Sequence, residues 1–213
     1  LRSLGVLIVL VAIGFSFKDF IFNKIVLPPL TSDFHTYRFL CYLADLTKFP
    51  ALCPESFQIQ MINITLSGQF MIHMLSSFMI AVIISVPYLL YESWKFIRPA
   101  LYPDEKKSVG KIFLSSSVLF YLGAAISYFI IFPFTLRFLG TYQVSEVVVN
   151  QISIQSYMNT LALLVFFMGL AFELPVVMYL LSQIGVVNKQ MLRTFRKYAF
   201  VVVLILAAFI TPT

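Results

Sequence analysis

Residues 68–91 read GQFMIHMLSSFMIAVIISVPYLLY, a stretch without a charged side chain. A helix that crosses a bilayer needs about 20 mostly apolar residues, so this stretch is long enough to span a membrane. Comparable apolar runs flank it, and together they predict five spans, at residues 4–22, 68–91, 112–136, 157–181 and 198–213. We therefore expect an all-α fold: one polytopic transmembrane domain over residues 1–213.

The composition agrees with a membrane protein. Hydrophobic residues make up 60% of the chain and charged residues 11%, and the mean hydropathy is +0.93. A water-soluble surface needs roughly a quarter of its residues charged, so lipid has to cover much of this one. The net charge of +6 would suggest nucleic acid as a partner of a soluble protein. Here the charges lie in short loops beside apolar runs, so we expect no nucleic-acid partner.

The positive charges are distributed unequally between the two sides of the membrane. Loops 92–111 and 182–197, together with the residue before the first span, hold ten of them: Arg2, Lys95, Arg98, Lys106, Lys107, Lys111, Lys189, Arg193, Arg196 and Lys197. Lys and Arg accumulate on the cytoplasmic side of membrane proteins. We therefore expect the N-terminus and these two loops in the cytoplasm, and loops 31–67 and 140–155 outside.

The first outside loop contains both cysteines of the chain, Cys41 and Cys53. An oxidising compartment permits a disulfide there, so a Cys41–Cys53 bridge is predicted, with two unpaired thiols as the alternative. The loop is expected to be ordered and partly extended, because residues 57–61 alternate apolar and polar side chains as strands do.

Sequence motifs for catalysis and cofactor binding are absent. The chain has no GxxxxGK[ST], GxGxxG, HExxH or CxxC pattern, which would mark phosphate, dinucleotide, zinc or redox sites. His35 and His73 stand alone, so we interpret them as packing or hydrogen-bonding residues. We expect no enzyme activity, no cofactor and no metal.

Five short blocks carry the most specific pattern in the chain. Residues 91–107 read YESWKFIRPALYPDEKK, and residues 119–133 read LFYLGAAISYFIIFP. FELP at 172–175, RTFRKY at 193–198 and ITP at 210–212 follow. In this order the blocks resemble the TatC family, the receptor subunit of the twin-arginine protein translocase. The family has an amphipathic segment before the first span and a sixth helix after the fifth, so we expect both ends of this chain to be trimmed.

The resemblance implies a binding and assembly protein in the cytoplasmic (inner) membrane of a bacterium. It would bind the twin-arginine signal peptides of folded precursor proteins at its cytoplasmic face. It would recruit single-span partners of the TatA and TatB types, form homo- and hetero-oligomers, and use the proton-motive force. The alternative is a small proton-coupled secondary transporter with Glu173 as the proton carrier, although we find none of the inverted repeats that such transporters usually show.

Glu105 coincides with a glutamate of the family pattern in the first cytoplasmic loop. A carboxylate can accept both N–H groups of an arginine fork, so the resemblance makes Glu105 a receptor for a signal-peptide arginine. The alternative is a solvated acid neutralised by Lys106 and Lys107. By resemblance, further residues shape the same surface, and their alternative role is interfacial anchoring: Phe96, Pro99, Leu101 and Tyr102.

Glu173 lies inside the fourth span. An acidic residue at the middle of a membrane costs about 2.5–3.5 kcal/mol on the insertion scale, so it should face a protein groove or water rather than lipid. We expect a polar, water-accessible concavity there that docks partner helices or the precursor. The alternative is a structural acid hydrogen-bonded to neighbouring helices.

Three other residues are candidates by position. Pro87 and Pro175 lie inside spans and are expected to bend their helices, and Pro175 frees the carbonyl of Ala171. We interpret Pro87 as simple helix curvature. Thr211 falls where the family has a polar contact site for its single-span partners, and capping of its own helix is the alternative.

Overall fold

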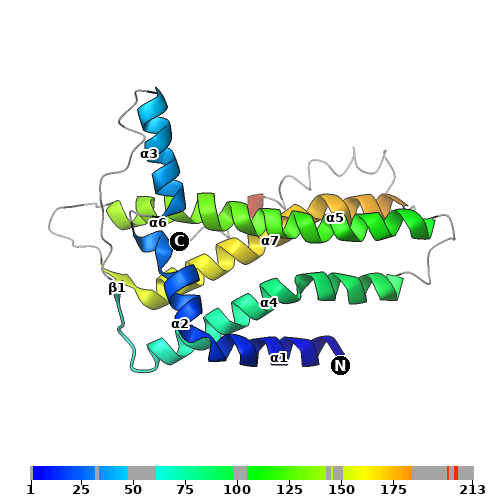
Figure 1. Ribbon diagram of the computed structural model, residues 1–213, viewed down its shortest axis with the longest axis horizontal. Coiled ribbons are helices and arrows are strands. Elements are labelled where there is room, and N and C mark those ends of the chain that lie inside the picture. The colour runs from blue at the N-terminus through cyan, green and yellow to red at the C-terminus, as the bar shows by residue number, and fades with distance from the viewer. Residues whose placement is uncertain are drawn as a thin grey trace.

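The computed structural model describes residues 2–31, 34–47, 61–97, 105–142, 145, 151–183, 201 and 204–205, without the side chains of 43, 47, 96–97, 105–111 and 183. Within this part of the chain the fold is built from long helices, three of which are long and apolar enough to cross a membrane (Figure 1). The predicted class, an all-α polytopic transmembrane protein, is therefore confirmed.

The three candidate spans lie in α4 (Gly68–Ile97), in α5 (Glu105–Ile126) with its continuation, and in α7 (Ile154–Gln183). Beyond α5 the chain passes through a π-helical turn, η5 (Ser127–Ile131), into α6 (Phe132–Thr141). Each helix extends past the apolar run that predicted it, so the cytoplasmic loop expected at 92–111 is shorter than predicted. The reason is that apolar runs mark only the part that fits lipid, whereas charged residues also favour helix outside it.

The first predicted span is bent rather than straight. Helix α1 (Arg2–Ser16) ends at Phe17, and α2 (Lys18–Ile21) begins a helical stretch bent by 81° against it. The charges of Lys18 and Asp19 explain the difference, because a straight helix over residues 4–22 would carry both into the hydrocarbon. Fifteen residues of α1 rise only about 22 Å, so this helix qualifies as a span only together with the following stretch.

The stretch after the bend ends where the prolines predicted. A π-helical turn, η1 (Phe22–Val26), and a 3₁₀ turn, η2 (Pro28–Leu30), complete it, and Thr31 is extended. Proline lacks the N–H that an α-helix needs and disfavours helical backbone in the residue before it. The Pro28–Pro29 pair therefore ends this helical stretch.

The loop predicted to lie outside, residues 31–67, contains a helix that we did not predict. Helix α3 (His35–Thr47) projects away from the long helices, at a steep angle to α6 (Figure 1). Tyr37 and Ala44 are buried on one of its faces, and the Tyr37 hydroxyl donates to the carbonyl of Pro133 at 3.0 Å. A small parallel ladder joins the two outside loops, pairing β1 (Met61–Ile62) with β2 (Ile152–Ser153). Of the residues expected to alternate, 57–60 lie outside the described part.

Three prolines leave carbonyls that hydroxyl groups of other elements satisfy. Proline cannot donate to the carbonyl four residues earlier, and in lipid such a carbonyl needs another partner. Tyr128 donates to the carbonyl of Ile25, freed by Pro29, at 2.6 Å. Tyr121 donates to the carbonyl of Ile83, freed by Pro87, at 3.2 Å. Thr36 donates to the carbonyl of Phe129, freed by Pro133. Pro87 thus contributes an interhelical bond in addition to the curvature that we predicted.

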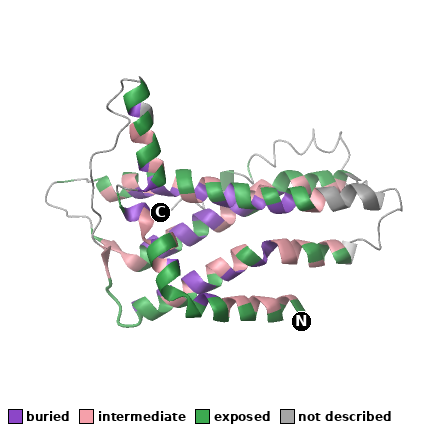
Figure 2. Ribbon diagram, in the orientation of Figure 1, coloured by how far each residue is buried: buried purple, intermediate pink, exposed green. Residues whose placement is uncertain are grey.

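The main cluster of buried residues centres on the first half of α7 and has further members on α2, η1, η2, α4, α5 and α6. The outer faces of the helices are exposed and apolar (Figure 2). Leu114, Val118 and Phe70 are each exposed by more than half, at 67%, 57% and 60%. Without a hydrophobic driving force inside lipid, such faces need no protein cover. Of the predicted fifth span, only Val201, Leu204 and Ile205 are described, and all three are helical.

Candidate functional site

Glu173 is held between α5 and α7. Its side chain is only 8% exposed, and the hydroxyl of Ser116 on α5 donates a hydrogen bond to its Oε2. Its other oxygen, Oε1, is buried and has no hydrogen-bond partner among the described residues. The carboxyl group is therefore turned into the protein rather than toward lipid, with one acceptor still free.

Two glycines bring α5 and α7 close enough for this hydrogen bond. A Cβ on Gly123 would lie 2.8 Å from the carbonyl oxygen of Met168, and a Cβ on Gly169 would lie 2.6 Å from the ring of Phe120. Small residues allow membrane helices to approach at backbone distance. The two helices run side by side (Figure 1), so the early part of α5 meets the late part of α7, where Glu173 lies.

Ser116, the partner of Glu173, is a residue that we did not predict. The available signal was the run Ser115–Ser117 in an otherwise apolar span. A serine hydroxyl can donate to a carboxylate without adding a second charge to the membrane interior. The hydrogen bond to a neighbouring helix, which belongs to the structural alternative, is present. The water-accessible concavity that we expected remains a prediction.

Pro175 lies two residues after Glu173 inside α7. It removes the N–H that would have bonded the carbonyl of Ala171. Among the described side chains, none donates to that carbonyl, in contrast to those freed by Pro29, Pro87 and Pro133. The region of α7 around Glu173 therefore offers two acceptors, a carboxylate oxygen and a backbone carbonyl, and neither has a side-chain donor there.

Two of the residues predicted to bind signal peptides lie where α4 ends and where α5 begins. Phe96 belongs to the last turn of α4, and Glu105 is the first residue of α5 rather than a loop residue, but neither side chain is described. The other members of the set lie outside the described residues: Pro99, Leu101 and Tyr102. Helix α4 ends at Ile97 and α5 begins at Glu105. Phe96 and Glu105 therefore lie on either side of one short connection.

The two other predicted sites are only partly described. Thr211 lies outside the described residues. Cys41 on α3 takes part in a disulfide, and Cys53 lies outside the described part, so the Cys41–Cys53 pairing stays a prediction. In the described ranges, no group of three His, Cys, Asp or Glu side chains is arranged to hold a metal ion.

Comparisons with known proteins agree with this architecture. The family model for the Sec-independent protein translocase protein (TatC) matches residues 1–213. The TatC protein of Blattabacterium sp. subsp. Periplaneta americana is 33% identical over 100% of this chain and 80% of its own length. That of Helicobacter pylori (strain J99) is 41% identical over 64% of this chain, and the match spans 54% of its own length.

A solved structure has the same fold. The crystal structure of the twin-arginine translocase receptor TatC superposes with a TM-score of 0.69 at 30% identity, covering 100% of this chain and 85% of that one. The chain therefore belongs to the TatC family of Sec-independent protein translocase components.

Proposed function

We propose that this chain is the receptor subunit of a twin-arginine translocase in a bacterial inner membrane. It binds the signal peptides of folded precursors at its cytoplasmic face, recruits single-span TatA- and TatB-type proteins, and works with the proton-motive force. The observation that carries this proposal is the family match over residues 1–213. The chain acts by binding and assembly, and not as an enzyme.

Glu105 is the proposed contact for a signal-peptide arginine. It is the first residue of α5, so the helix fixes the position of its backbone. The signal peptide would reach it from the cytoplasm. A carboxylate pairs with the planar guanidinium through two parallel hydrogen bonds, which the point charge of a lysine ammonium cannot reproduce. Recognition of arginine over lysine follows from this geometry.

Glu173 and its surroundings are the proposed contact for partner helices. The buried carboxyl group already accepts from Ser116 and keeps Oε1 free. On the same helix, Leu170, Leu174 and Val177 are exposed by 42%, 48% and 46%. A single-span helix that packs on this apolar face and carries one hydrogen-bond donor would satisfy Oε1 without exposing it to lipid. Thr211 is proposed to support the same contact.

A proton-coupled transporter is not favoured, because a family match to a protein translocase component covers the whole chain. The free Oε1 of Glu173 could accept a hydrogen bond from a partner helix as readily as it could bind a proton. Docking is the role that agrees with the family.

The test is co-purification of the chain with a precursor that carries a twin-arginine signal peptide. We expect capture of this precursor, loss of capture when both arginines become lysines, and about tenfold or greater loss for Glu105→Gln, since one charge-assisted pair is removed. Glu92→Gln is the matched control. Glu92 accepts from Tyr88 at 3.2 Å, and its change to glutamine removes one negative charge just as Glu105→Gln does. Equal capture of the arginine and lysine precursors would contradict the proposal.

A further inference from the structure

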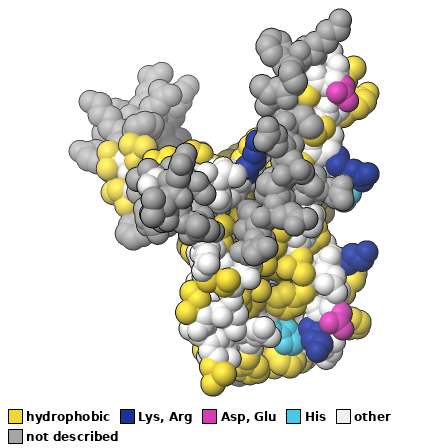
Figure 3. Space-filling view, turned by 90° about the vertical axis from the view of Figure 1, so that its left-hand side faces the viewer, with side chains coloured by type: hydrophobic (Ala, Val, Ile, Leu, Met, Phe, Trp, Pro, Cys, Tyr) yellow, Lys and Arg dark blue, Asp and Glu magenta, His cyan; other side chains and the backbone are white. Residues whose placement is uncertain are grey.

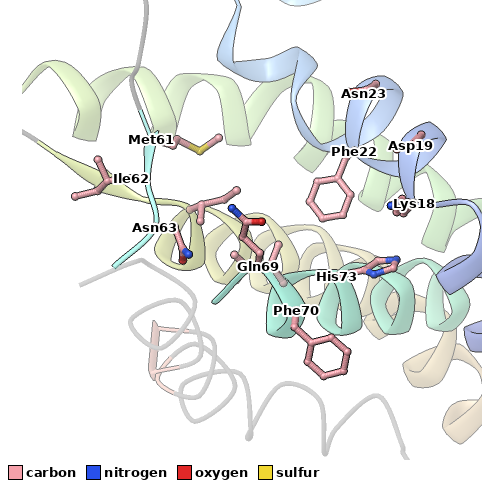
Figure 4. A pocket seen from close by; sticks show the side chains of 12 residues that line it. Lys18, Asp19, Phe22, Asn23, Met61, Ile62, Asn63, Gln69, Phe70 and His73 are labelled. Atoms are coloured by element: carbon pink, nitrogen blue, oxygen red, sulfur yellow. The ribbon is translucent and has the colours of Figure 1, made fainter. Parts of the chain in front are cut away.

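A cavity of about 670 Å³ lies beside the bend of the first span (Figure 4). It is formed by three segments far apart in sequence: α2 with η1, the stretch from β1 through its turn to the first turns of α4, and the start of α7. Its lining combines charged, amide and aromatic side chains with aliphatic walls: Lys18, Asp19, Phe22, Asn23, Met61, Ile62, Asn63, Gln69, Phe70, Ile72, His73 and Ile154. None of these residues belongs to the sites proposed above.

The wall formed by β1 is fixed by backbone and side-chain bonds. Met61 and Ile62 pair with Ile152 and Ser153 of β2, immediately before α7. Asn63 donates from Nδ2 to the carbonyl of Thr65 at 3.0 Å. A Cβ on Gly68 would lie 2.1 Å from Oδ1 of Asn63, so glycine lets the turn close against α4. The cavity therefore has a rigid wall before any ligand arrives.

His73 fixes the opposite side of the cavity. Its Nε2 lies 3.1 Å from the carbonyl oxygen of Phe15, and because a carbonyl only accepts, Nε2 carries the proton. The His73 ring also stacks on the ring of Phe15 with centroids 4.0 Å apart. These contacts hold the end of α1 against α4, so the bend that shapes the cavity is locked by a side chain of another helix.

The charged groups at the cavity are of opposite sign and exposed. Lys18 and Asp19 are neighbours in the chain, both are exposed, and among the described residues neither is part of a salt bridge. Figure 3 shows basic, acidic and histidine side chains next to one another on this face of the molecule. An anion alone would meet Asp19 and a cation alone would meet Lys18, so the pair is complementary to a ligand that carries both charges.

The surroundings place the cavity at the surface of the bilayer. Lys18 is the first charge after the apolar run of α1, and α4 begins at Gly68 on the same side. Phe17, Phe20 and Phe70 are exposed by 61%, 61% and 60%. Aromatic side chains are enriched where the hydrocarbon meets the headgroups. A ligand in the cavity would thus have charged groups at Lys18 and Asp19 and apolar groups beside the phenylalanines.

We propose that this cavity binds the headgroup of an ethanolamine phospholipid. The phosphate pairs with Lys18 and accepts from the amide groups of Asn23 and Gln69. The primary ammonium donates to Asp19, and the acyl chains lie along Phe20 and Phe70. A choline headgroup has no N–H to donate to Asp19, and a glycerol headgroup has no positive charge, so both should bind more weakly.

The test is lipid binding to the full chain, delipidated in detergent. Phosphatidylethanolamine, phosphatidylcholine and phosphatidylglycerol with the same acyl chains are titrated, and the affinity is read by native mass spectrometry and by the shift in Tm. We expect at least about tenfold tighter binding of the ethanolamine lipid, which Lys18→Gln and Asp19→Asn each abolish. Lys24→Gln and Asp45→Asn are the controls, because both residues are exposed and neither lines the cavity.

Three results would overturn the proposal. The first is equal affinity for the three lipids, and the second is unchanged binding in both cavity variants. The third is binding of soluble glycerophosphoethanolamine as tight as that of the lipid, which would assign the cavity to a soluble ligand. Because Tm and mass are measured without a precursor, the outcome does not depend on the proposed receptor function.

Discussion

The bend of the first span and the contact between α5 and α7 are held together in opposite ways. From the bend at Phe17 to η1 the backbone leaves the α-helical pattern, and side chains of other elements bond its carbonyl groups. His73 bonds the carbonyl of Phe15, Tyr128 that of Ile25 and Tyr157 that of Val26. Between α5 and α7 the backbones stay helical and come close through Gly123 and Gly169. Irregular backbone in a membrane requires donors from its neighbours, whereas regular helices require only small residues.

The largest stability effect is expected from loss of the predicted Cys41–Cys53 disulfide. Cys41→Ser should lower the free energy of unfolding by about 3 kcal/mol if Cys41 closes a short loop with Cys53. Chemical unfolding in detergent would measure it. Cys53→Ser and the double variant should match the single variant, since either change removes the same bridge. Two alkylatable thiols in non-reduced wild type would contradict the pairing.

The next largest effect should come from the α5–α7 contact. Gly123→Ala places a methyl group against the carbonyl of Met168, a backbone atom that cannot move aside easily, so we expect a loss of about 1–3 kcal/mol. Gly5→Ala is the control, because a Cβ there meets nothing within 4 Å. Thermal unfolding of both variants would measure the difference. Equal Tm values for the two would mean that α5 and α7 do not pack at backbone distance.

Removing one hydroxyl at the bend should have a smaller effect. Tyr128→Phe leaves the carbonyl of Ile25 without its 2.6 Å donor, which should cost about 1 kcal/mol. Tyr121→Phe should cost less, since its bond to Ile83 is 3.2 Å long and its side chain is 39% exposed. Unfolding midpoints and hydrogen exchange would compare the two. A larger loss for Tyr121→Phe would contradict the account of the bend.

The smallest stability effect is expected at Glu173, where function should change instead. Glu173→Ala should weaken crosslinking to single-span partners or export while yield and Tm stay near wild type, and Glu173→Gln should be milder because a neutral hydrogen-bonding group remains. Ser116→Ala is the companion variant, since it removes the donor to Oε2 only. Normal crosslinking and export in both Glu173 variants would make the site structural. Export lost in Glu173→Gln alone, with binding kept, would point to proton transfer.

Local composition was sufficient to predict the transmembrane class and the positions of the long helices. In lipid the stretch at 68–91 has to be helical, because every backbone polar group must be bonded within the segment. The family could also be recognised, because its blocks at 91–107 and 119–133 are contiguous in sequence. The termination at Pro28–Pro29 followed from the chemistry of proline alone.

Helix α3 and the bend at Phe17 could not be read from the same patterns. The polar loop 31–67 contains a helix because Thr36 donates to the carbonyl of Phe129 on η5 and Tyr37 donates to the carbonyl of Pro133 on α6. The bend depends on His73, which is 58 residues from Phe15, and on Ser16, which donates back to the carbonyl of Ala12. A hydropathy window averages over such single contacts and reports only the mean.

The sequence by itself determined that this chain is a membrane protein, where three of its long apolar helices lie and which family it belongs to, because each depends on residues that are neighbours in the chain. Only the tertiary structure decided that Glu173 shares a hydrogen bond with Ser116 and that Lys18, Asn63 and His73 line one cavity. Ser116 and Glu173 are 57 residues apart. Their contact exists because Gly123 and Gly169 let α5 and α7 approach closely. Helix packing depends on which side-chain surfaces fit together, and not on the order of residues in the chain.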